Sequence, residues 1–179
     1  YARGGKVRHV TKEAGFHSGS VSEDGEYIYD RYTCLNYPKR NAVITQDNEQ
    51  VRVLAELRLD DYKPYRFVIP ELFEIQDAED RVYHARIYKP DDFDAEKKYP
   101  VVFHVYGGPH GQVVQNRFGD HFAQILVNEG FLVFSMDNRG SAGRGHVWET
   151  PIHRRFGEIE LEDQLVGLEY LGSLPYVDS

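Results

Sequence analysis

Several residue types are scarce in this chain of 179 residues, and each scarcity excludes a class of protein. Cys34 is the single cysteine, so no disulfide can form within the chain, and the redox compartment stays undecided. No apolar run approaches the roughly 18 residues that a membrane-spanning helix requires. Positive charge is also in deficit, with 21 basic against 29 acidic residues and a net charge of −8. We therefore expect no nucleic acid and no anionic membrane as a partner of this segment.

Metal and nucleotide motifs are missing as well. The eight histidines include no H-x-x-x-H pair and lie near no cysteine cluster, so the sequence predicts no metal site. The glycines at residues 140–145 match neither the dinucleotide fingerprint nor the P-loop. The remaining composition, 41% hydrophobic and 28% charged, is that of an ordinary globular protein able to bury a core.

The first third of the chain predicts an antiparallel β-sheet. Four β-rich runs, the first two joined by an Asp-Gly turn, occur at residues 17–22, 26–32, 41–46 and 51–57. Residues 36–40 are expected to form a loop. Four short strands with tight turns match one blade of a β-propeller, which needs neighbouring blades to bury both of its faces. The polar, proline-containing residues 58–64 are expected to link this part to the next.

The middle of the chain predicts a strand, a glycine-rich turn, a helix and a second strand. Residues 101–106 are almost wholly apolar or aromatic and stop at Gly-Gly-Pro, and residues 131–136 form a similar run. The helix between them is expected to turn its apolar side to the core through Phe118, Phe122, Ile125 and Leu126. This succession implies a parallel strand pair, with the glycine-rich turn at the carboxyl end, where open α/β sheets bind ligands.

The order of elements from residue 66 onwards is that of one known fold. Residues 66–76 and 81–88 predict an antiparallel hairpin ahead of the middle unit, and residues 158–172 predict a closing helix. The core side of that helix is expected to carry Ile159, Leu165, Leu168 and Leu171. The fold class is therefore α/β, the first half of an α/β-hydrolase. Its nucleophile would lie in a G-x-S-x-G motif after the following strand, and that motif does not occur here.

Tyr106 is the candidate catalytic residue. It stands at the end of a buried strand, immediately before Gly-Gly-Pro, and the first strand–helix turn of an α/β-hydrolase supplies part of the oxyanion hole. A tyrosine hydroxyl is a neutral donor that can stabilise the charge developing on a carbonyl oxygen. The alternative is a tyrosine that only packs under a loop.

Three clusters of residues resemble the prolyl oligopeptidase family of serine peptidases. They are Val-Tyr-Gly-Gly-Pro at residues 105–109, Asp-Asn-Arg-Gly-Ser at 137–141, and Arg-Arg-Phe-Gly-Glu at 154–158 with Glu-Asp-Gln at 162–164. The last two clusters are most similar to the dipeptidyl peptidase IV branch. The resemblance is strong over residues 99–171 and weaker but consistent over the β-rich first third.

This resemblance implies a β-propeller that caps an α/β-hydrolase domain, and the release of X-Pro or X-Ala dipeptides from peptide N-termini. Residues 1–59 would be the final propeller blade, and residues 60–179 the first half of the hydrolase domain. Tyr106 matches the family's oxyanion tyrosine, and His110 and Gln112 are expected to border the leaving-group side of the site. The family's catalytic Ser, Asp and His would lie beyond residue 179, so we expect this stretch alone to be inactive.

The resemblance also bears on partners and on rival functions. It implies peptide substrates, no cofactor and a homodimer for the full-length protein, while the compartment stays open between cytoplasm and periplasm. A prolyl endopeptidase, an acylaminoacyl peptidase and a non-catalytic scaffold relative remain alternatives. Tyr106 argues against the acylaminoacyl peptidase, which resembles this turn but usually has histidine there.

Overall fold

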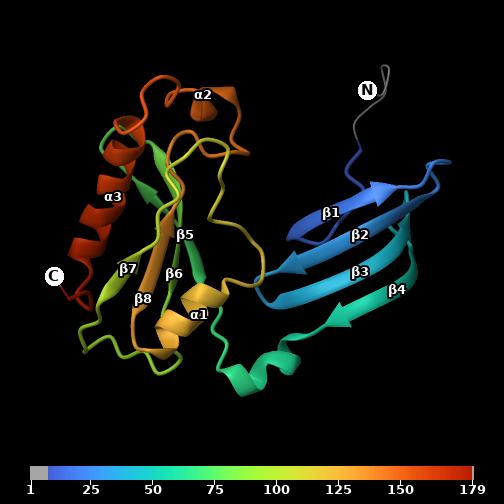
Figure 1. Ribbon diagram of the computed structural model, residues 1–179, viewed down its shortest axis with the longest axis horizontal. Helices are drawn as coiled ribbons and strands as arrows, with labels where there is room; N and C mark the ends of the chain where they lie inside the picture. The colour runs from blue at the N-terminus through green and yellow to red at the C-terminus, as the bar shows by residue number, and fades with distance from the viewer. Residues whose placement is uncertain (1–7, 179) are drawn as a thin grey trace. The chain divides into compact units, whose positions relative to one another are not determined.

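The computed structural model describes residues 8–178 and consists of two compact units (Figure 1). The first unit comprises the chain up to Pro64 together with residues 116–119. The second comprises residues 65–115 and the chain from Asp120 onwards.

The first unit is a four-stranded antiparallel sheet in the order β1-β2-β3-β4. Its strands are β1 (Phe16–Val21), β2 (Tyr27–Cys34), β3 (Tyr37–Thr45) and β4 (Gln50–Leu57). The four predicted strands are confirmed, but the loop predicted at residues 36–40 is wrong, because β3 already begins at Tyr37. Pro38 is tolerated there because the pairing of β2 with β3 shifts register between Tyr32 and Cys34, and a proline at such an irregularity removes no regular ladder bond.

Residues 116–119 pack against this sheet, although they come from far along the chain. The Asn116 Oδ1 atom accepts a hydrogen bond from the backbone N–H of Leu35 (3.1 Å), and the backbone N–H of Phe118 donates to the Thr33 hydroxyl (3.2 Å). The expectation that Phe118 belongs to the core side of a helix is therefore wrong. Its backbone N–H is bonded to a strand of the first unit, so the helix starts later.

The second unit is a mixed sheet in the order β5-β6-β8-β7 with two long helices. It follows a 3-10 helix, η1 (Leu59–Tyr65), in the predicted linker. Strands β5 and β6 pair antiparallel and β7 and β8 pair parallel, as the sequence predicts. The antiparallel pairing of β6 with β8 joins the two predicted units into one sheet. The elements are β5 (Glu71–Gln76), β6 (Val82–Tyr88), β7 (Val101–Phe103), α1 (His121–Asn128), β8 (Leu132–Met136), α2 (His146–Glu149) and α3 (Ile159–Ser173).

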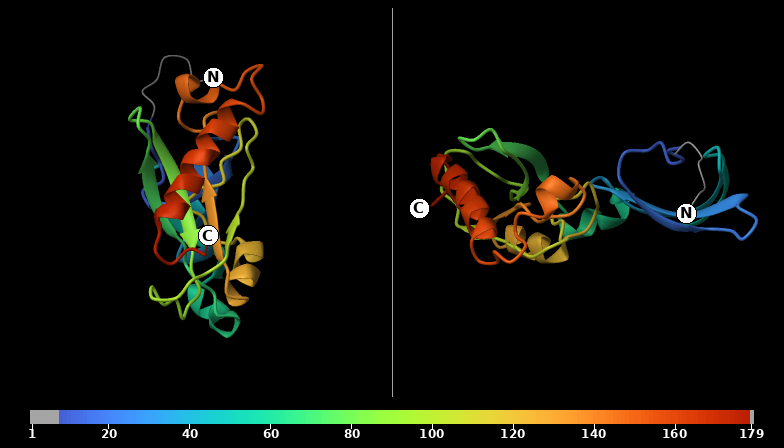
Figure 2. Two further views of the ribbon diagram at one scale, coloured as in Figure 1. Left: turned by 90° about the vertical axis from the view of Figure 1, so that its left-hand side faces the viewer. Right: turned by 90° about the horizontal axis from the view of Figure 1, so that it is seen from above.

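Helices α1 and α3 cover opposite faces of this sheet. Every residue of β8 is buried, and successive side chains of a strand point to opposite faces. Val133 packs with Ala123 and Val127 of α1, whereas Phe134 and its neighbours two residues away pack with the Leu171 side of α3. Figure 2 shows α3 lying along one face of the sheet. The core of the unit is therefore two apolar layers, one on each side of β8.

The buried sides of both helices match those predicted only in part, since Ile159 and Leu171 of α3 are buried as predicted but other predicted core residues are exposed. Phe122 and Ile125 of α1 are exposed, as are Leu165 and Leu168 of α3, while the small or polar residues Ala123, Gly167, Asp163 and Gln164 face the sheet. Small residues let a helix approach a crowded sheet: a Cβ atom added at Gly167 would lie 3.1 Å from the rings of Phe103 and Phe134. Helix α1 starts late because the Asp120 carboxylate caps it, accepting the Ala123 backbone N–H (3.1 Å).

The chain after α3 returns to the free edge of β7. Val177 forms a parallel bridge with Tyr99. The Tyr99 backbone N–H donates to the Tyr176 carbonyl (2.9 Å), and the Asp178 backbone N–H donates to the Tyr99 carbonyl (2.9 Å). This edge of β7 is the one opposite β8. Any strand that continued from here would run parallel to β7.

The two glycines of α3 give a matched pair for a test of helix packing. We expect Gly167→Leu to lower the free energy of unfolding by about 1–3 kcal/mol, because the added side chain overpacks the Phe103–Phe134 contact. Gly172→Leu should not lower it, because a Cβ there meets no atom within 4 Å and leucine is the better helix former. Denaturant unfolding followed by Trp148 fluorescence measures both variants. An equal effect at the two positions would contradict this packing.

Candidate active site

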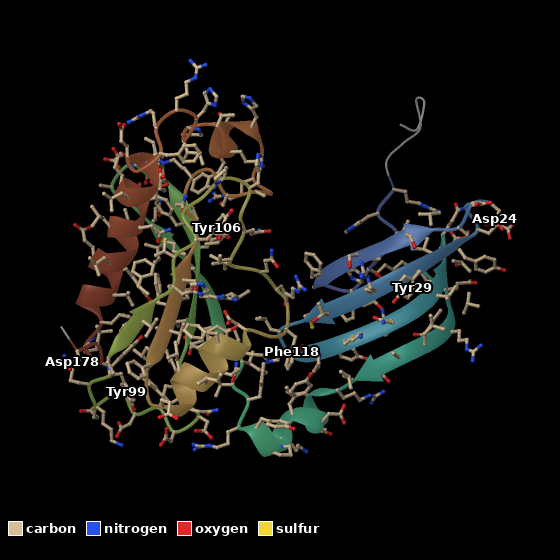
Figure 3. All side chains as sticks on the ribbon, viewed as in Figure 1. Asp24, Tyr29, Tyr99, Tyr106, Phe118 and Asp178 are labelled. Carbon is tan, nitrogen blue, oxygen red and sulfur yellow. The ribbon has the colours of Figure 1, made fainter. Side chains whose placement is uncertain are left out.

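Tyr106 lies just past the carboxyl end of β7, at the opposite end of this strand from Tyr99 (Figure 3). The parallel pairing continues one residue past β7, since the backbone N–H of His104 donates to the Phe134 carbonyl (2.8 Å). Tyr106 is 58% exposed. Within residues 8–178 no hydrogen bond is made by its hydroxyl, so this donor is available to a ligand.

The Tyr106 ring lies against the backbone of the turn that follows it. A Cβ atom added at Gly111 would lie 2.1 Å from two ring carbons, and one added at Gly108 would lie 3.3 Å from the hydroxyl oxygen. Any side chain at Gly111 would therefore displace the ring. Gly107 adopts a left-handed φ of 74°, which glycine does at no steric cost. The position of the hydroxyl thus depends on the path of the turn backbone.

The segment after β8 holds this turn at two points. The Asn138 side-chain amide donates to the Gly107 carbonyl (3.4 Å), and the His110 backbone N–H donates to the Gly140 carbonyl (3.0 Å). His110 has a left-handed φ of 57°, a conformation that costs a non-glycine residue free energy and needs support from its surroundings. The bond to Gly140 supplies part of that support.

Asp137 holds the next part of the same segment. Its buried carboxylate accepts the backbone N–H groups of Val113 (2.7 Å) and Val114 (3.3 Å). Burial raises the pKa of Asp137 above its ordinary value, although these two hydrogen bonds act in the opposite direction. The carboxyl end of β8 is therefore where the backbone following Tyr106 is tied to the sheet.

Helix α3 in turn fixes the segment after β8. The Arg139 guanidinium donates to both Asp163 oxygens, with distances of 2.6–3.0 Å, and the Arg139 backbone N–H donates to the same carboxylate (2.7 Å). The hydrogen bond to Asp163 raises the pKa of Arg139. Tyr83 of β6 donates its hydroxyl to Asp163 (3.0 Å), and the Gln164 amide donates to the Asn138 Oδ1 atom (2.9 Å).

Sequence reasoning missed the roles of Asp137, Asn138 and Asp163. All three lie in clusters that carry the family resemblance, and Asp137 directly follows a buried strand, which is a usable signal for the carboxyl edge of the sheet. The buried side of α3 gave no such signal, because its apolar periodicity pointed to Leu165 and Leu168, which the structure leaves exposed.

The two other predicted site residues lie on the same side of the turn but in different surroundings. His110 lines a cavity of about 730 Å³ formed with α2 and the loop that follows it. Glu149 of α2 faces His110, with 3.8 Å between its Oε2 atom and His110 Nδ1, and its Oε1 atom accepts the Gly143 backbone N–H (3.2 Å). Gln112 does not line the cavity. Its side-chain amide lies beside Gly143 instead.

The chemistry that this arrangement offers is a neutral hydrogen-bond donor at the carboxyl edge of an α/β sheet. Across residues 8–178 no three His, Cys, Asp or Glu side chains are grouped to hold a metal ion. None of the helices described for the chain is both long and apolar enough to cross a membrane. A donor held by a fixed backbone turn suits stabilisation of an oxyanion.

Comparison with known proteins places the chain in a class of enzymes. The model of the prolyl oligopeptidase family matches residues 116–179. The chain is 31% identical over 183 residues to dipeptidyl peptidase 8 of Homo sapiens and to that of Mus musculus, covering 97% of this chain and 20% of each relative. The crystal structure of Porphyromonas gingivalis dipeptidyl peptidase 4 superposes with a TM-score of 0.89 at 29% identity, covering 99% of this chain and 26% of that one.

The fold is thus a β-propeller blade followed by the start of an α/β-hydrolase domain. Residues 116–179 thus match the prolyl oligopeptidase family, and over nearly its whole length the chain is similar to dipeptidyl peptidases, among them dipeptidyl peptidase 4. It spans about a fifth of the length of the curated relatives it matches.

The two acidic neighbours at the start of α3 provide a test of the Arg139 anchor. We expect Asp163→Ala to lower the free energy of unfolding by about 3–5 kcal/mol, because it leaves a largely buried guanidinium with only the exposed Glu162 as an ion-pair partner. Glu162→Ala removes the outer partner of Arg139, whose side chain is 58% exposed, and should cost about 1 kcal/mol or less. Denaturant midpoints and slopes measure both variants. If the two changes cost the same, Asp163 does not anchor this loop.

Proposed function

We propose that the intact protein is a serine exopeptidase that releases X-Pro or X-Ala dipeptides from peptide N-termini. In this mechanism a serine hydroxyl attacks the carbonyl carbon of the second residue of the peptide, and a histidine accepts the serine proton. The histidine then gives that proton to the nitrogen of the third residue as the peptide bond breaks. The observation that carries the proposal is the unpartnered Tyr106 hydroxyl at the carboxyl edge of the sheet. It would donate to the carbonyl oxygen as that oxygen gains negative charge.

The return of the chain to the edge of β7 supports this proposal. A strand continuing from the Tyr99–Val177 bridge would run parallel to β7 and end at the same edge of the sheet as Tyr106. In an α/β-hydrolase the nucleophile follows that strand on a sharp turn. Such a nucleophile and Tyr106 would then meet from neighbouring strands. The proposed division is a final propeller blade at residues 1–59 and a half hydrolase domain at residues 60–179.

The cavity beside the turn is the proposed place for the leaving group. His110 and the adjoining Pro109 line it, and both directly follow the Tyr106 turn. The residue of the peptide beyond the cleaved bond would rest against His110. Gln112 would border this leaving-group region from beside Gly143. Glu149 supplies a carboxylate next to His110, 3.8 Å from its Nδ1 atom.

The oxyanion role is tested by removal of one oxygen atom. In the intact protein, Tyr106→Phe should lower kcat for a Gly-Pro amide by about 10²–10³-fold, because one oxyanion donor is lost in the transition state. KM should stay close to wild type, since the donor acts on charge that is absent from the bound substrate. Tyr27→Phe, on β2, is the matched control and should be neutral. A wild-type kcat in folded Tyr106→Phe would refute the role.

The leaving-group side is tested by comparing substrates. We expect His110→Ala to lower kcat/KM for a Gly-Pro-Phe peptide by about tenfold relative to Gly-Pro amide, because one side-chain contact is worth about 1–3 kcal/mol. Gln112→Ala should have a smaller effect of the same sign. His121→Ala, on α1, serves as the control. If His110→Ala lowers both substrates equally, His110 does not contact the leaving group.

A further inference from the structure

We propose that Asp137 is a positioning residue that sets the place of the Tyr106 hydroxyl through the backbone of the turn. The proposal rests on the proposed oxyanion role of Tyr106 and adds the residue that makes that role geometrically possible. Asp137 does not reach the substrate. It acts on the segment that begins at Tyr106 and ends at Val114.

Asp137 is itself rigidly placed. Its backbone N–H donates to the His84 carbonyl of β6 (3.0 Å), so the residue extends the pairing of β6 with β8. Its side chain is buried, and both carboxylate oxygens accept the Val114 N–H at 3.3 Å while Oδ1 also accepts the Val113 N–H at 2.7 Å. The carboxylate therefore holds the backbone of residues 113 and 114 at a fixed place relative to the sheet.

The charge of Asp137 is not explained by an ion pair. His84 and Arg86 favour its ionised form from a distance, but they form their own ion pairs with Glu74 (3.6 Å) and Asp120 (2.7 Å). A buried carboxylate without a bonded cation costs free energy unless hydrogen bonds satisfy it. Here those hydrogen bonds come from backbone groups of a single short segment. An apolar residue would fill the same space at lower cost but could not hold that backbone.

The Tyr106 hydroxyl has no fixed partner of its own within residues 8–178, so its position follows the turn backbone. Its ring rests on Gly108 and Gly111, and the segment carrying these glycines is held by Asn138 and Asp137. Release of the Asp137 contact would let the turn shift and carry the hydroxyl with it. A displacement of about 1 Å can cost about 10²-fold in rate.

A double-mutant cycle in the intact enzyme separates positioning from a merely structural role. Asp137→Ala removes the acceptor and should lower kcat by about 10–100-fold with KM within about twofold of wild type, because only the transition-state contact of the Tyr106 hydroxyl is lost. In a Tyr106→Phe background, Asp137→Ala should cause no further loss of kcat, because the hydroxyl that it positions is already gone. Asp94→Ala is the control: Asp94 also accepts a loop N–H, from Glu96 (3.0 Å), but precedes β7 at the other end of the sheet.

The outcomes are separable. An equal fold-loss from Asp137→Ala in both backgrounds, or an unchanged kcat in the folded single variant, overturns the positioning role while leaving that of Tyr106 intact. If Tyr106→Phe alone has wild-type kcat, the oxyanion role and the positioning role both fail. Should circular dichroism show that Asp137→Ala is unfolded, Asp137→Asn takes its place, since the amide keeps Oδ1 as an acceptor and loses only the charge and the Oδ2 bond to Val114. The same two criteria then decide.

Discussion

The ion pair between Arg139 and Asp163 is the contact on which the rest of the site depends. It joins α3 to the segment after β8 with hydrogen bonds from both the guanidinium and the backbone, and the Asp163 side chain is fully buried. Tyr83 adds a third element, since its hydroxyl reaches the same carboxylate from β6. Strand β6, the segment after β8 and helix α3 thus meet at one carboxylate. Removal of Arg139 would leave the Asp163 charge buried without a cation, and removal of Asp163 would leave the largely buried Arg139 with only the exposed Glu162.

A series of hydrogen bonds connects the core of the second unit to Tyr106. Helix α3 holds residues 137–140, those residues hold the turn after β7, and the turn carries Tyr106. Each step uses a hydrogen bond to backbone, which fixes position without filling the space in front of the hydroxyl. This arrangement reconciles two requirements of an oxyanion donor: a fixed place and a free O–H.

Much of the fold could be predicted from the sequence because it depends on local patterns. Strand periodicity located all four strands of the first unit and the parallel β7–β8 pair. The strand predicted at residues 101–106 is shorter than expected, because β7 ends at Phe103, before the glycine turn. The errors have identifiable causes. Pro38 suggested a loop, but it lies at a register shift, and Phe118 suggested a helix, but its backbone bonds to Thr33, 85 residues earlier in the chain. Of the predicted core residues of α3, Ile159 and Leu171 are buried but Leu165 and Leu168 are exposed, because Asp163 and Gln164 are buried instead, contrary to simple apolar patterning.

The sequence by itself determined the order of strands and helices, the position of Tyr106 at the end of a strand, and the family. These follow from spacing within short windows and from clusters of neighbouring residues. Only the tertiary structure decided which carboxylates are buried and what they hold. Asp163 meets a tyrosine 80 residues away, and Asp137 meets a backbone N–H 24 residues away. Contacts over such separations depend on how the sheet and α3 pack together, and no local pattern encodes their partners.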